Sequence, residues 1–404
     1  SDGSSKEQAQ KYIQTLLLWM TKNDASDLFI LAGFPPAVKI HGELIPIPDA
    51  PRIMPEQSHL LTTSVMNSIQ YAEFENTKEC NFAISISGIG RFRVNALQQR
   101  ASSGMVIRVI RTSIPKLHDL GVPALLGELS MTKRGLLIMV GATGSGKSTT
   151  LAAMIDHRNE NSKGHIITIE DPIEFTHNHK KCIITQREVG VDTDSWGAAL
   201  KNTLRQAPDV IFMGEIRDRE TMEYALQFAE TGHLCMATLH ANNSYHALNR
   251  VINFFPLESR TSLYLDLSAS LKAIVSQRLV KKPDGKRTPA AEILLNTRHV
   301  QELIERGEIL AIKEAMEQSL APGSQTFEQD LFRLYRGGVI TLDEALANSD
   351  SPTNLSWLIN NSEITNTSQQ PELSIEAALD FAETDDGGTS FKEFSISLDT
   401  PEEQ

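Results

Sequence analysis

The chain has 404 residues, 40% of them hydrophobic, which is enough to build two or three ordinary domains. A bilayer-spanning helix needs about 20 apolar residues, and the longest candidate, Tyr12–Met20, is too short and contains Gln14 and Thr15. Three scattered cysteines are too few for a disulfide framework or a zinc knuckle, so we expect them to be buried apolar residues. Residues 1–5 resemble a tag remnant with no signal peptide after them, and we expect a cytoplasmic protein.

The net charge of −13 is unevenly distributed. Residues 363–404 contain eleven acidic residues and one basic residue, a net charge of −10, which leaves −3 for the rest. So acidic a segment, with few apolar residues, predicts a disordered tail. It would repel nucleic acid and anionic lipid, so we expect no nucleic-acid partner. Two apolar patches, 375–381 and 391–398, leave a partner-binding role open.

Residues 6–113 predict an α+β domain. A helix with apolar residues at helical spacing is expected at 7–22, and another at 55–70. Short alternating runs predict strands at 28–32, 37–41, 43–46, 81–87, 91–98 and 105–111. Residues 114–119 contain Pro115, which opposes a helix, and are predicted to form a linker.

Residues 120–362 predict a second domain in which strands and helices alternate. The expected strands are 136–140, 165–169, 210–213 and 234–238, and the expected helices are 149–158, 196–206, 219–229 and 245–253. This order predicts a parallel sheet with helices on its faces and a nucleotide at the carboxyl ends of the strands. The remainder, 259–362, is expected to be mainly helical. The fold class is therefore α/β, with an α+β domain in front.

A complete Walker A phosphate loop follows the first strand of this domain. The expected nucleotide-binding residues are Gly141, Ala142, Thr143, Gly144, Ser145, Gly146, Lys147, Ser148 and Thr149. Glycines let successive backbone N–H groups face phosphate oxygens, Lys147 reaches the β- and γ-phosphates, and the Ser148 hydroxyl faces Mg²⁺. The helix that follows directs its positive dipole end at the anion. The sequence therefore predicts ATP and Mg²⁺ as ligands.

Carboxylates follow two of the expected parallel strands. Glu170 comes after the apolar run 165–169, and Glu215 comes after 210–213 with Gly214 where a Walker B aspartate usually stands. Glu215 has the position of a catalytic base that orients or deprotonates water, and the aspartate's role at Mg²⁺ passes to Glu170 or to water. The expected metal residues are Ser148, Glu170 and Glu215. Solvated acidic caps on strand ends are the alternative.

Two histidines and two arginines are further candidates. His233 and His240 bracket the apolar run 234–239, where a structural role competes with a catalytic one, and no third ligand supports zinc. Arg93 and Arg108 lie on expected strands of the first domain. Such arginines are usually solvated, but they would neutralise phosphoryl charge if this domain closed over the nucleotide.

The motifs together resemble the secretion-ATPase superfamily, and specifically the type IV pilus retraction ATPases of the PilT and PilU type. Besides the Walker A loop, the resemblance rests on an Asp box at 168–175, an atypical Walker B motif at 209–218 and a His box at 231–240. The segment Gly90–Asn95 resembles the family's arginine-bearing PAS-like domain, so the resemblance covers roughly residues 6–362. It implies a PAS-like domain, a RecA-like ATPase domain and a ring of six with nucleotide between the two domains of a subunit. It also implies arginine fingers at Arg93 and Arg108, and makes His233 and His240 sensors of the γ-phosphate or structural supports.

One departure concerns the subtype. PilT-type enzymes carry a helix motif reading Ala-Ile-Arg-Asn-Leu-Ile-Arg-Glu, and the corresponding stretch here, His299–Arg306, has Gln301 in place of the first arginine. The chain is in this respect more similar to the accessory PilU type. The implied partners are a PilT-like retraction ATPase and an inner-membrane platform protein of the pilus. Assembly ATPases of the superfamily, with paired cysteines and a longer N-terminal region, are a weaker alternative.

Two functions stay open on the sequence alone: an ATP-hydrolysing motor for pilus retraction, and a nucleotide-binding ring that docks on a partner motor. The sequence favours hydrolysis, because every catalytic position carries a chemically competent residue.

Overall fold

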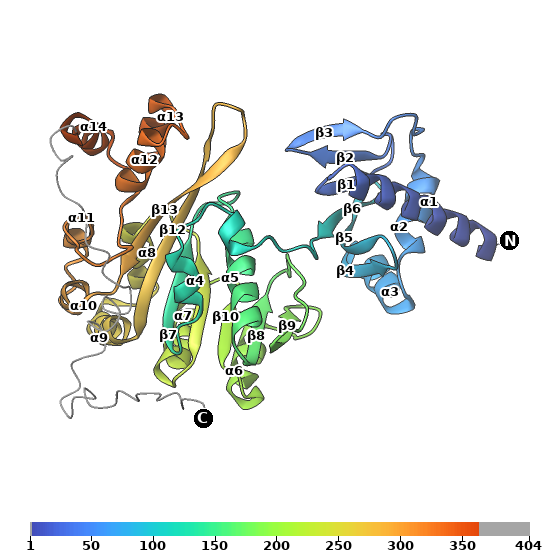
Figure 1. Ribbon diagram of the computed structural model, residues 1–404. Helices are drawn as coiled ribbons and strands as arrows, with labels where there is room; N and C mark the ends of the chain where they lie inside the picture. Colours follow the sequence, from blue (N-terminus) through green and yellow to red (C-terminus); the bar gives the residue numbers. More distant parts are fainter. Residues whose placement is uncertain (1, 363–404) are drawn as a thin grey trace, which may run out of the picture. The chain divides into compact units, whose positions relative to one another are not determined.

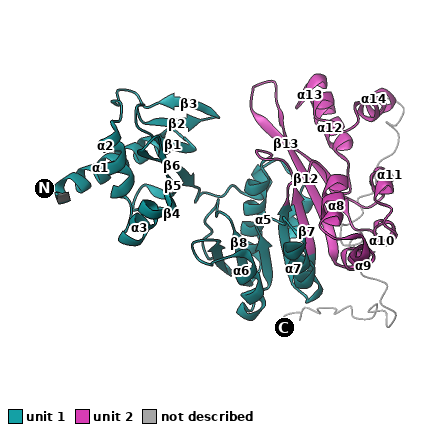
Figure 2. Ribbon diagram, turned by 180° about the vertical axis from the view of Figure 1, so that it is seen from behind, with its two compact units in different colours: residues 1–135, 146–238 teal, residues 136–145, 239–404 magenta. Residues whose placement is uncertain are grey.

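The computed structural model describes residues 2–362, which divide into two compact units (Figures 1 and 2). Of the described residues, the first unit comprises 2–135 and 146–238, and the second comprises 136–145 and 239–362. Within residues 2–362, no helix has the length and apolar character needed to cross a membrane. The expected acidic tail, 363–404, lies outside the described residues.

The first unit contains a six-stranded antiparallel sheet with strand order β3-β2-β1-β6-β5-β4. Its strands are β1 (Asp27–Ile30), β2 (Ala37–Ile40), β3 (Glu43–Pro46), β4 (Glu79–Ile86), β5 (Gly90–Gln99) and β6 (Ser102–Ile110). Buried and more exposed residues alternate along β5, as in a strand with one face on the core. Phe92, Val94 and Ala96 are fully buried, while the residues between them are more exposed. Helix α1 (Asp2–Lys22), which includes most of the presumed tag remnant, contributes Leu17 and Met20 to the same core.

Residues 55–77 form two helices where the sequence predicts one helix over 55–70. These helices are α2 (Pro55–Ser64) and α3 (Ser68–Thr77). Asn67 separates them, because its side chain accepts a hydrogen bond from the backbone N–H of Gln70 at 2.9 Å and so caps the start of α3. The apolar spacing continues across the break, which is why the periodicity alone does not reveal it.

The second sheet has seven strands in the order β13-β12-β7-β11-β10-β8-β9. Its strands are β7 (Gly135–Val140), β8 (Gly164–Glu170), β9 (Cys182–Glu188), β10 (Val210–Met213), β11 (Leu234–Leu239), β12 (Leu271–Lys281) and β13 (Arg287–Leu295). Within the first unit, β9, β8, β10 and β11 run parallel, with Thr168 opposite Phe212 and Phe212 opposite Met236. All residues of β10 are buried, as expected for a parallel strand covered on both faces. The carboxyl ends of β8 and β10 therefore lie at the same edge.

Helices make up most of the remaining structure. They are α4 (Leu125–Ser130), α5 (Lys147–Asn161), α6 (Trp196–Thr203), α7 (Arg219–Glu230), α8 (Ser244–Asn253), α9 (Arg260–Ser270), α10 (Arg298–Glu305), α11 (Ile312–Glu317), α12 (Phe327–Arg336), α13 (Leu342–Ala347) and α14 (Pro352–Asn361). Three-residue 3₁₀ turns flank several of them, and one such turn, Leu117–Asp119, lies in the expected linker. All three cysteines are buried, as expected.

Helices α9–α14 predominate after residue 259, as expected, but this part of the second unit also contains a strand pair that was not expected. Strands β12 and β13 form a long antiparallel pair within it, and β12 also runs parallel to β7. The stretch Ala273–Val275 is fully buried, as in a central strand. Short apolar runs do not distinguish a buried strand from a helix, which explains why this strand pair was not predicted.

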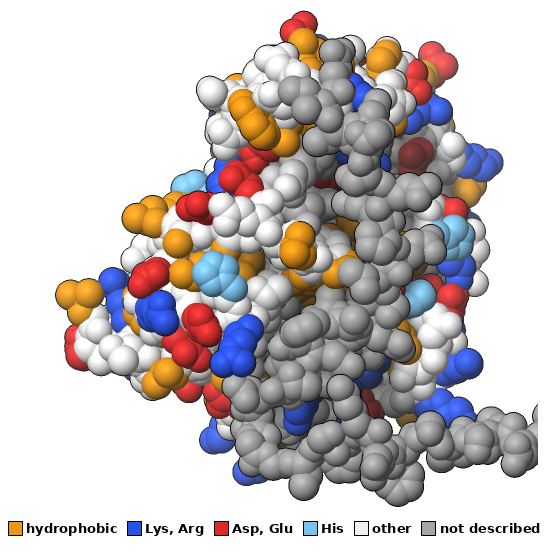
Figure 3. Space-filling view, turned by 60° about the vertical axis from the view of Figure 1, so that its left-hand side comes forward, with side chains coloured by type: hydrophobic (Ala, Val, Ile, Leu, Met, Phe, Trp, Pro, Cys, Tyr) orange, Lys and Arg blue, Asp and Glu red, His pale blue; other side chains and the backbone are white. Residues whose placement is uncertain are grey.

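Figure 3 shows one face of the molecule, where exposed apolar side chains are scattered among charged ones.

Candidate nucleotide-binding site

The phosphate loop connects β7 to α5 and has the backbone that its glycines permit. Gly144 and Gly146 have φ angles of +81° and +82°, in the left-handed region that favours glycine. Gly141 is required for another reason, because a Cβ there would overlap the Ser145 side chain and lie 3.0 Å from the carbonyl oxygen of Gln277. The crest of the loop, Ala142–Gly144, is exposed to solvent.

The loop residues of the second unit are held by β12. The side-chain amide of Gln277 donates to the carbonyl oxygen of Ser145 at 3.0 Å. The Ser145 hydroxyl is buried and has no hydrogen-bond partner in the structure. A buried donor without a partner costs free energy, and a phosphate oxygen would satisfy it. The loop therefore fits the phosphate group that the sequence predicts.

Lys147 begins α5 in the first unit and is almost fully buried, with 8% of its surface exposed. Burial lowers the pKa of Lys147, while the carboxylates of Glu215 and Glu174 raise it. These two carboxylates thus stabilise the ammonium form in a place where water cannot. A cation held in this way is suited to a polyphosphate chain.

Glu215 is brought to this place by Gly214, which follows β10. The backbone N–H of Gly214 donates to the carbonyl oxygen of Ile169 at 2.7 Å, and the Thr238 hydroxyl donates to the carbonyl oxygen of Gly214. A Cβ on residue 214 would lie 3.2 Å from the Cα of Glu170, closer than almost all real Cβ contacts. Glycine in place of the Walker B aspartate thus relieves crowding, because a side chain at this position would press on the backbone of β8.

Glu170 ends β8, with polar neighbours on both sides. Its Oε2 accepts hydrogen bonds from the Thr168 hydroxyl at 2.7 Å and from the Gln186 amide at 3.2 Å. Burial raises the pKa of Glu170 to about 7; these hydrogen bonds lower it, and the Glu174 and Glu188 carboxylates raise it further. Glu170 therefore exchanges a proton near neutral pH, a property common among functional carboxylates.

This pKa predicts a pH-dependent stability. The ordinary pKa is 4.5, so between pH 4.5 and about 7 the folded chain retains a proton that the unfolded chain has released. Stability must fall as the pH rises through this window. Between pH 4.5 and about 7, the free energy of unfolding of the wild type should fall by up to about 3 kcal/mol more than that of Glu170→Gln, which has no carboxyl group to titrate at this position. Urea unfolding of both proteins at the two ends of the window measures this.

An exposed carboxylate provides the control for that experiment. Glu223 is half exposed and pairs with Arg219 on α7, so Glu223→Gln should show no comparable pH-dependent difference. A constant difference between wild type and Glu170→Gln at all pH values would show that Glu170 has an ordinary pKa.

Mg²⁺ fits the residues present at this edge of the sheet. It is usually held by one or two carboxylates, nucleotide phosphates and water, rather than by a cage of protein ligands. In keeping with this, no group of three His, Cys, Asp or Glu side chains within residues 2–362 could hold a metal ion. Ser148 in the first turn of α5 supplies a hydroxyl, and Glu170 and Glu215 supply carboxylates.

The two candidate histidines lie at opposite ends of β11. His233 precedes the strand, at the amino end of the parallel sheet, where its Nδ1 lies 3.1 Å from the Thr231 hydroxyl and 3.3 Å from the carbonyl oxygen of Phe228. These local contacts are those of a structural support. His240 follows the strand, at its carboxyl end, where parallel sheets bind ligands.

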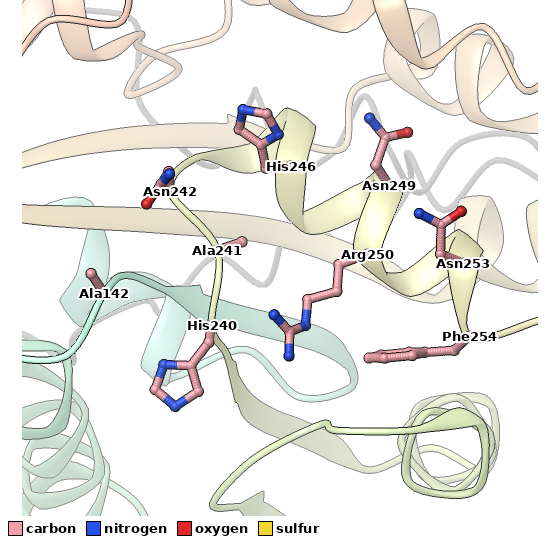
Figure 4. Close-up of a pocket in the computed structure, with 9 residues that line it drawn as sticks. All are labelled: Ala142, His240, Ala241, Asn242, His246, Asn249, Arg250, Asn253 and Phe254. Carbon is pink, nitrogen blue, oxygen red and sulfur yellow. The ribbon is translucent and has the colours of Figure 1, made fainter.

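His240 lines a pocket of about 680 Å³ in the second unit (Figure 4). The lining residues are Ala142, His240, Ala241, Asn242, His246, Asn249, Arg250, Asn253 and Phe254. No carboxylate is among them, whereas imidazole, guanidinium and amide groups all can donate hydrogen bonds. The pocket adjoins Ala142 of the phosphate loop, and its chemistry suits an anionic group.

Arg93 and Arg108 stand directly opposite each other on β5 and β6, so they share one face of the antiparallel sheet. Arg93 Nη1 lies 3.3 Å from Oε1 of Glu188, and Arg108 Nε lies 2.8 Å from Oδ1 of Asp27. Like charges opposite each other repel. Each arginine here has its own carboxylate partner, and Arg108 remains 69% exposed.

Some of these functional neighbours were not predicted from the sequence. Glu188, Thr168 and Gln186 lie around Glu170, and Glu188 also accepts a hydrogen bond from the backbone N–H of Ile173 at 3.0 Å. Glu188 and Gln186 belong to β9, a strand absent from the expected elements. The apolar run Cys182–Ile184 was the signal that could have revealed it.

The comparison with known families agrees with this geometry. A family described as "Type II/IV secretion system protein" matches residues 3–302. The chain belongs to this family. It is 52% identical over 94% of its length to the type IV pilus ATPase PilU of Pseudomonas aeruginosa, covering 99% of that protein. It is 40% identical over 85% of its length to the PilT retraction ATPase of the same organism, covering 99% of it.

Among solved structures, the family's pilus retraction motor PilT with bound ADP resembles the chain with a TM-score of 0.78 and 42% identity. This likeness covers 83% of the chain and 96% of PilT. The prediction of an ATPase of the PilT and PilU type is confirmed, and identity to PilU exceeds identity to PilT. The α/β class of the fold is confirmed too.

Proposed function

We propose that the chain is the subunit of a hexameric, ATP-hydrolysing motor that powers or assists type IV pilus retraction. One observation carries the proposal: buried Lys147 at the start of α5 is balanced by the carboxylates of Glu215 and Glu174. A phosphate-binding cation and a base for water thus occupy one site. Purified chain with Mg²⁺ and ATP should release phosphate, and the absence of release would overturn the proposal.

The site residues have distinct roles in phosphate binding and in hydrolysis. Backbone N–H groups of the loop and Lys147 bind the phosphates, and Glu215 holds the attacking water and accepts its proton. When bound, Mg²⁺ neutralises phosphate charge; the Ser148 hydroxyl, Glu170 and Glu215 would hold it. His240 contacts the γ-phosphate side, while His233 supports the turn before β11.

The domain organisation is part of the proposal. Residues 6–113 form a PAS-like domain, 114–119 a linker and 120–362 a RecA-like ATPase domain, followed by an acidic, disordered tail. Six subunits form a ring in the cytoplasm at the inner-membrane pilus platform protein, with a PilT-like retraction ATPase as partner. Support comes from the likeness to PilU and PilT over most of the chain.

A second candidate, a nucleotide-binding ring that docks on a partner retraction ATPase, is favoured by one residue. Gln301 on α10 replaces the first arginine of the PilT-type motif, and its amide lies 3.5 Å from the carbonyl oxygen of Asn296. Phosphate release by the chain alone distinguishes the two. Release that occurs only when a PilT-type protein is added would favour this candidate.

The two arginines give a prediction for the first domain. Arg93→Ala and Arg108→Ala should each lower the ATPase rate about a thousandfold, because an arginine that neutralises charge on the transferred phosphoryl group has at least this effect. Phosphate release and the mass of the assembly, measured together, check that the ring persists. Arg52→Ala, an exposed arginine of the same domain, is the control and should hydrolyse normally. Normal rates in both test variants would make Arg93 and Arg108 ordinary surface residues.

A further inference from the structure

Neighbouring residues of β12 hold two different loops of the second unit. Gln277 binds the carbonyl oxygen of Ser145 in the phosphate loop. The next residue, Arg278, binds the carbonyl oxygen of Asn242 at 3.1 Å, two residues after His240. Successive side chains of a strand point to opposite faces. β12 thus contacts both segments that line the pocket of Figure 4.

Arg278 has further partners in the segment between α13 and α14. Its Nη1 donates to the carbonyl oxygen of Asn348 and its Nη2 to Oδ1 of Asp350, both at 2.6 Å. The guanidinium lies 3.8 Å from the ring centre of Phe327 on α12. The Arg278 and Asp350 side chains are only about one-fifth exposed. A planar, multiply bonded and stacked guanidinium is one that lysine cannot replace.

The His240 loop, residues 240–243, is fixed at a second point by the same carboxylate. Asn243 donates to Oδ2 of Asp350 at 2.8 Å, and its Oδ1 accepts from the backbone N–H of His246 at 2.9 Å. Asn243 thereby caps α8 and binds the C-terminal segment at once. Only four residues separate β11 from α8, so anchoring Asn242 and Asn243 restricts His240.

We propose that Arg278 is a positioning residue for ATP hydrolysis, which holds the His240 loop against the α13–α14 segment through Asp350. The inference rests on the proposed function of the site. It assigns to Arg278 an effect transmitted through His240 rather than direct contact with nucleotide. It also makes the C-terminal helices part of the catalytic apparatus, because the same guanidinium binds both segments.

The test measures turnover with and without His240. Arg278→Ala should lower kcat about tenfold and leave ADP affinity within about twofold, because the phosphate loop is held by Gln277. In a His240→Ala background, the same change should cost less than about twofold, since residues acting through one group are not additive. Equal losses in both backgrounds, or an unchanged kcat, would overturn the proposal.

Matched variants separate this role from general loss of fold. Arg333→Ala removes an ion pair with Asp330 on α12 without reaching the His240 loop, and should leave kcat unchanged. Arg278→Lys keeps the charge but not the planar fork and should lose nearly as much as Arg278→Ala, whereas Asp350→Asn preserves size and should give an intermediate loss. A fall in kcat for Arg333→Ala equal to that for Arg278→Ala would contradict a specific role.

Hydrogen exchange keeps the proposal testable even if the chain hydrolyses no ATP. Without nucleotide, backbone amides of 241–246 should exchange faster in Arg278→Ala than in wild type, because the bond to the carbonyl oxygen of Asn242 is lost and Asp350, which binds Asn243, loses its guanidinium partner. Unchanged exchange of these amides would overturn the proposal that Arg278 holds the His240 loop. Absent phosphate release by the wild type, in contrast, would overturn the proposed function only.

Discussion

Glu215→Gln is expected to bind ATP and to hydrolyse it at least about a hundredfold more slowly than the wild type, because loss of a positioned base has this effect. The amide keeps the shape of the side chain and its hydrogen bonding but not its basicity. Nucleotide affinity and single-turnover phosphate release, measured on the same preparation, separate binding from chemistry. Glu223→Gln makes the same chemical change at an exposed site of α7 and serves as control.

A different result would move the assignment. If Glu215→Gln turned over at half the normal rate, the base would be Glu170, whose pKa of about 7 makes it the next candidate. In that case Glu170→Gln should carry the large loss instead.

Lys147→Ala should act on binding, with nucleotide affinity about a hundredfold weaker, because a charge-assisted phosphate contact made in the ground state is removed. The variant also leaves the carboxylates of Glu215 and Glu174 without the cation whose pKa they raise. Titration with a fluorescent ADP measures the affinity. Lys201→Ala, an exposed lysine of α6, is the control. Unchanged affinity in Lys147→Ala would refute the phosphate-loop assignment.

Three strands of the parallel sheet, β7, β8 and β10, could be predicted because each contains a short apolar run followed by glycine or a carboxylate. β10 was predicted at its observed bounds, Val210–Met213, and β7 and β8 within one residue at each end. The chemistry at their carboxyl ends follows from chain order alone, since parallel strands present these ends at one edge. Lys147, Glu170 and Glu215 belong to this predictable set.

Contacts between distant segments could not be predicted in this way. β12 and β13 are strands because they pair with each other and β12 pairs with β7, whose sequence is far away. The role proposed for Arg278 depends on hydrogen bonds to Asn242 and Asn348, which are 36 and 70 residues away in the sequence. Periodicity reports which face of an element is buried, but not which remote groups meet there.

Gly214 also limits which sequences this site can accept. An aspartate there would crowd β8, because its Cβ would lie 3.2 Å from the Cα of Glu170 and 3.1 Å from the carbonyl oxygen of Ile169. The strand carrying Glu170 would have to move away, and the Gly214 N–H bond to Ile169 would lengthen with it. The usual Walker B residue would therefore fit only if the backbone at Ile169 and Glu170 yielded by a few tenths of an ångström. Gly214→Asp is thus a substitution whose effect depends on how far β8 can shift, and Glu170 would shift with it.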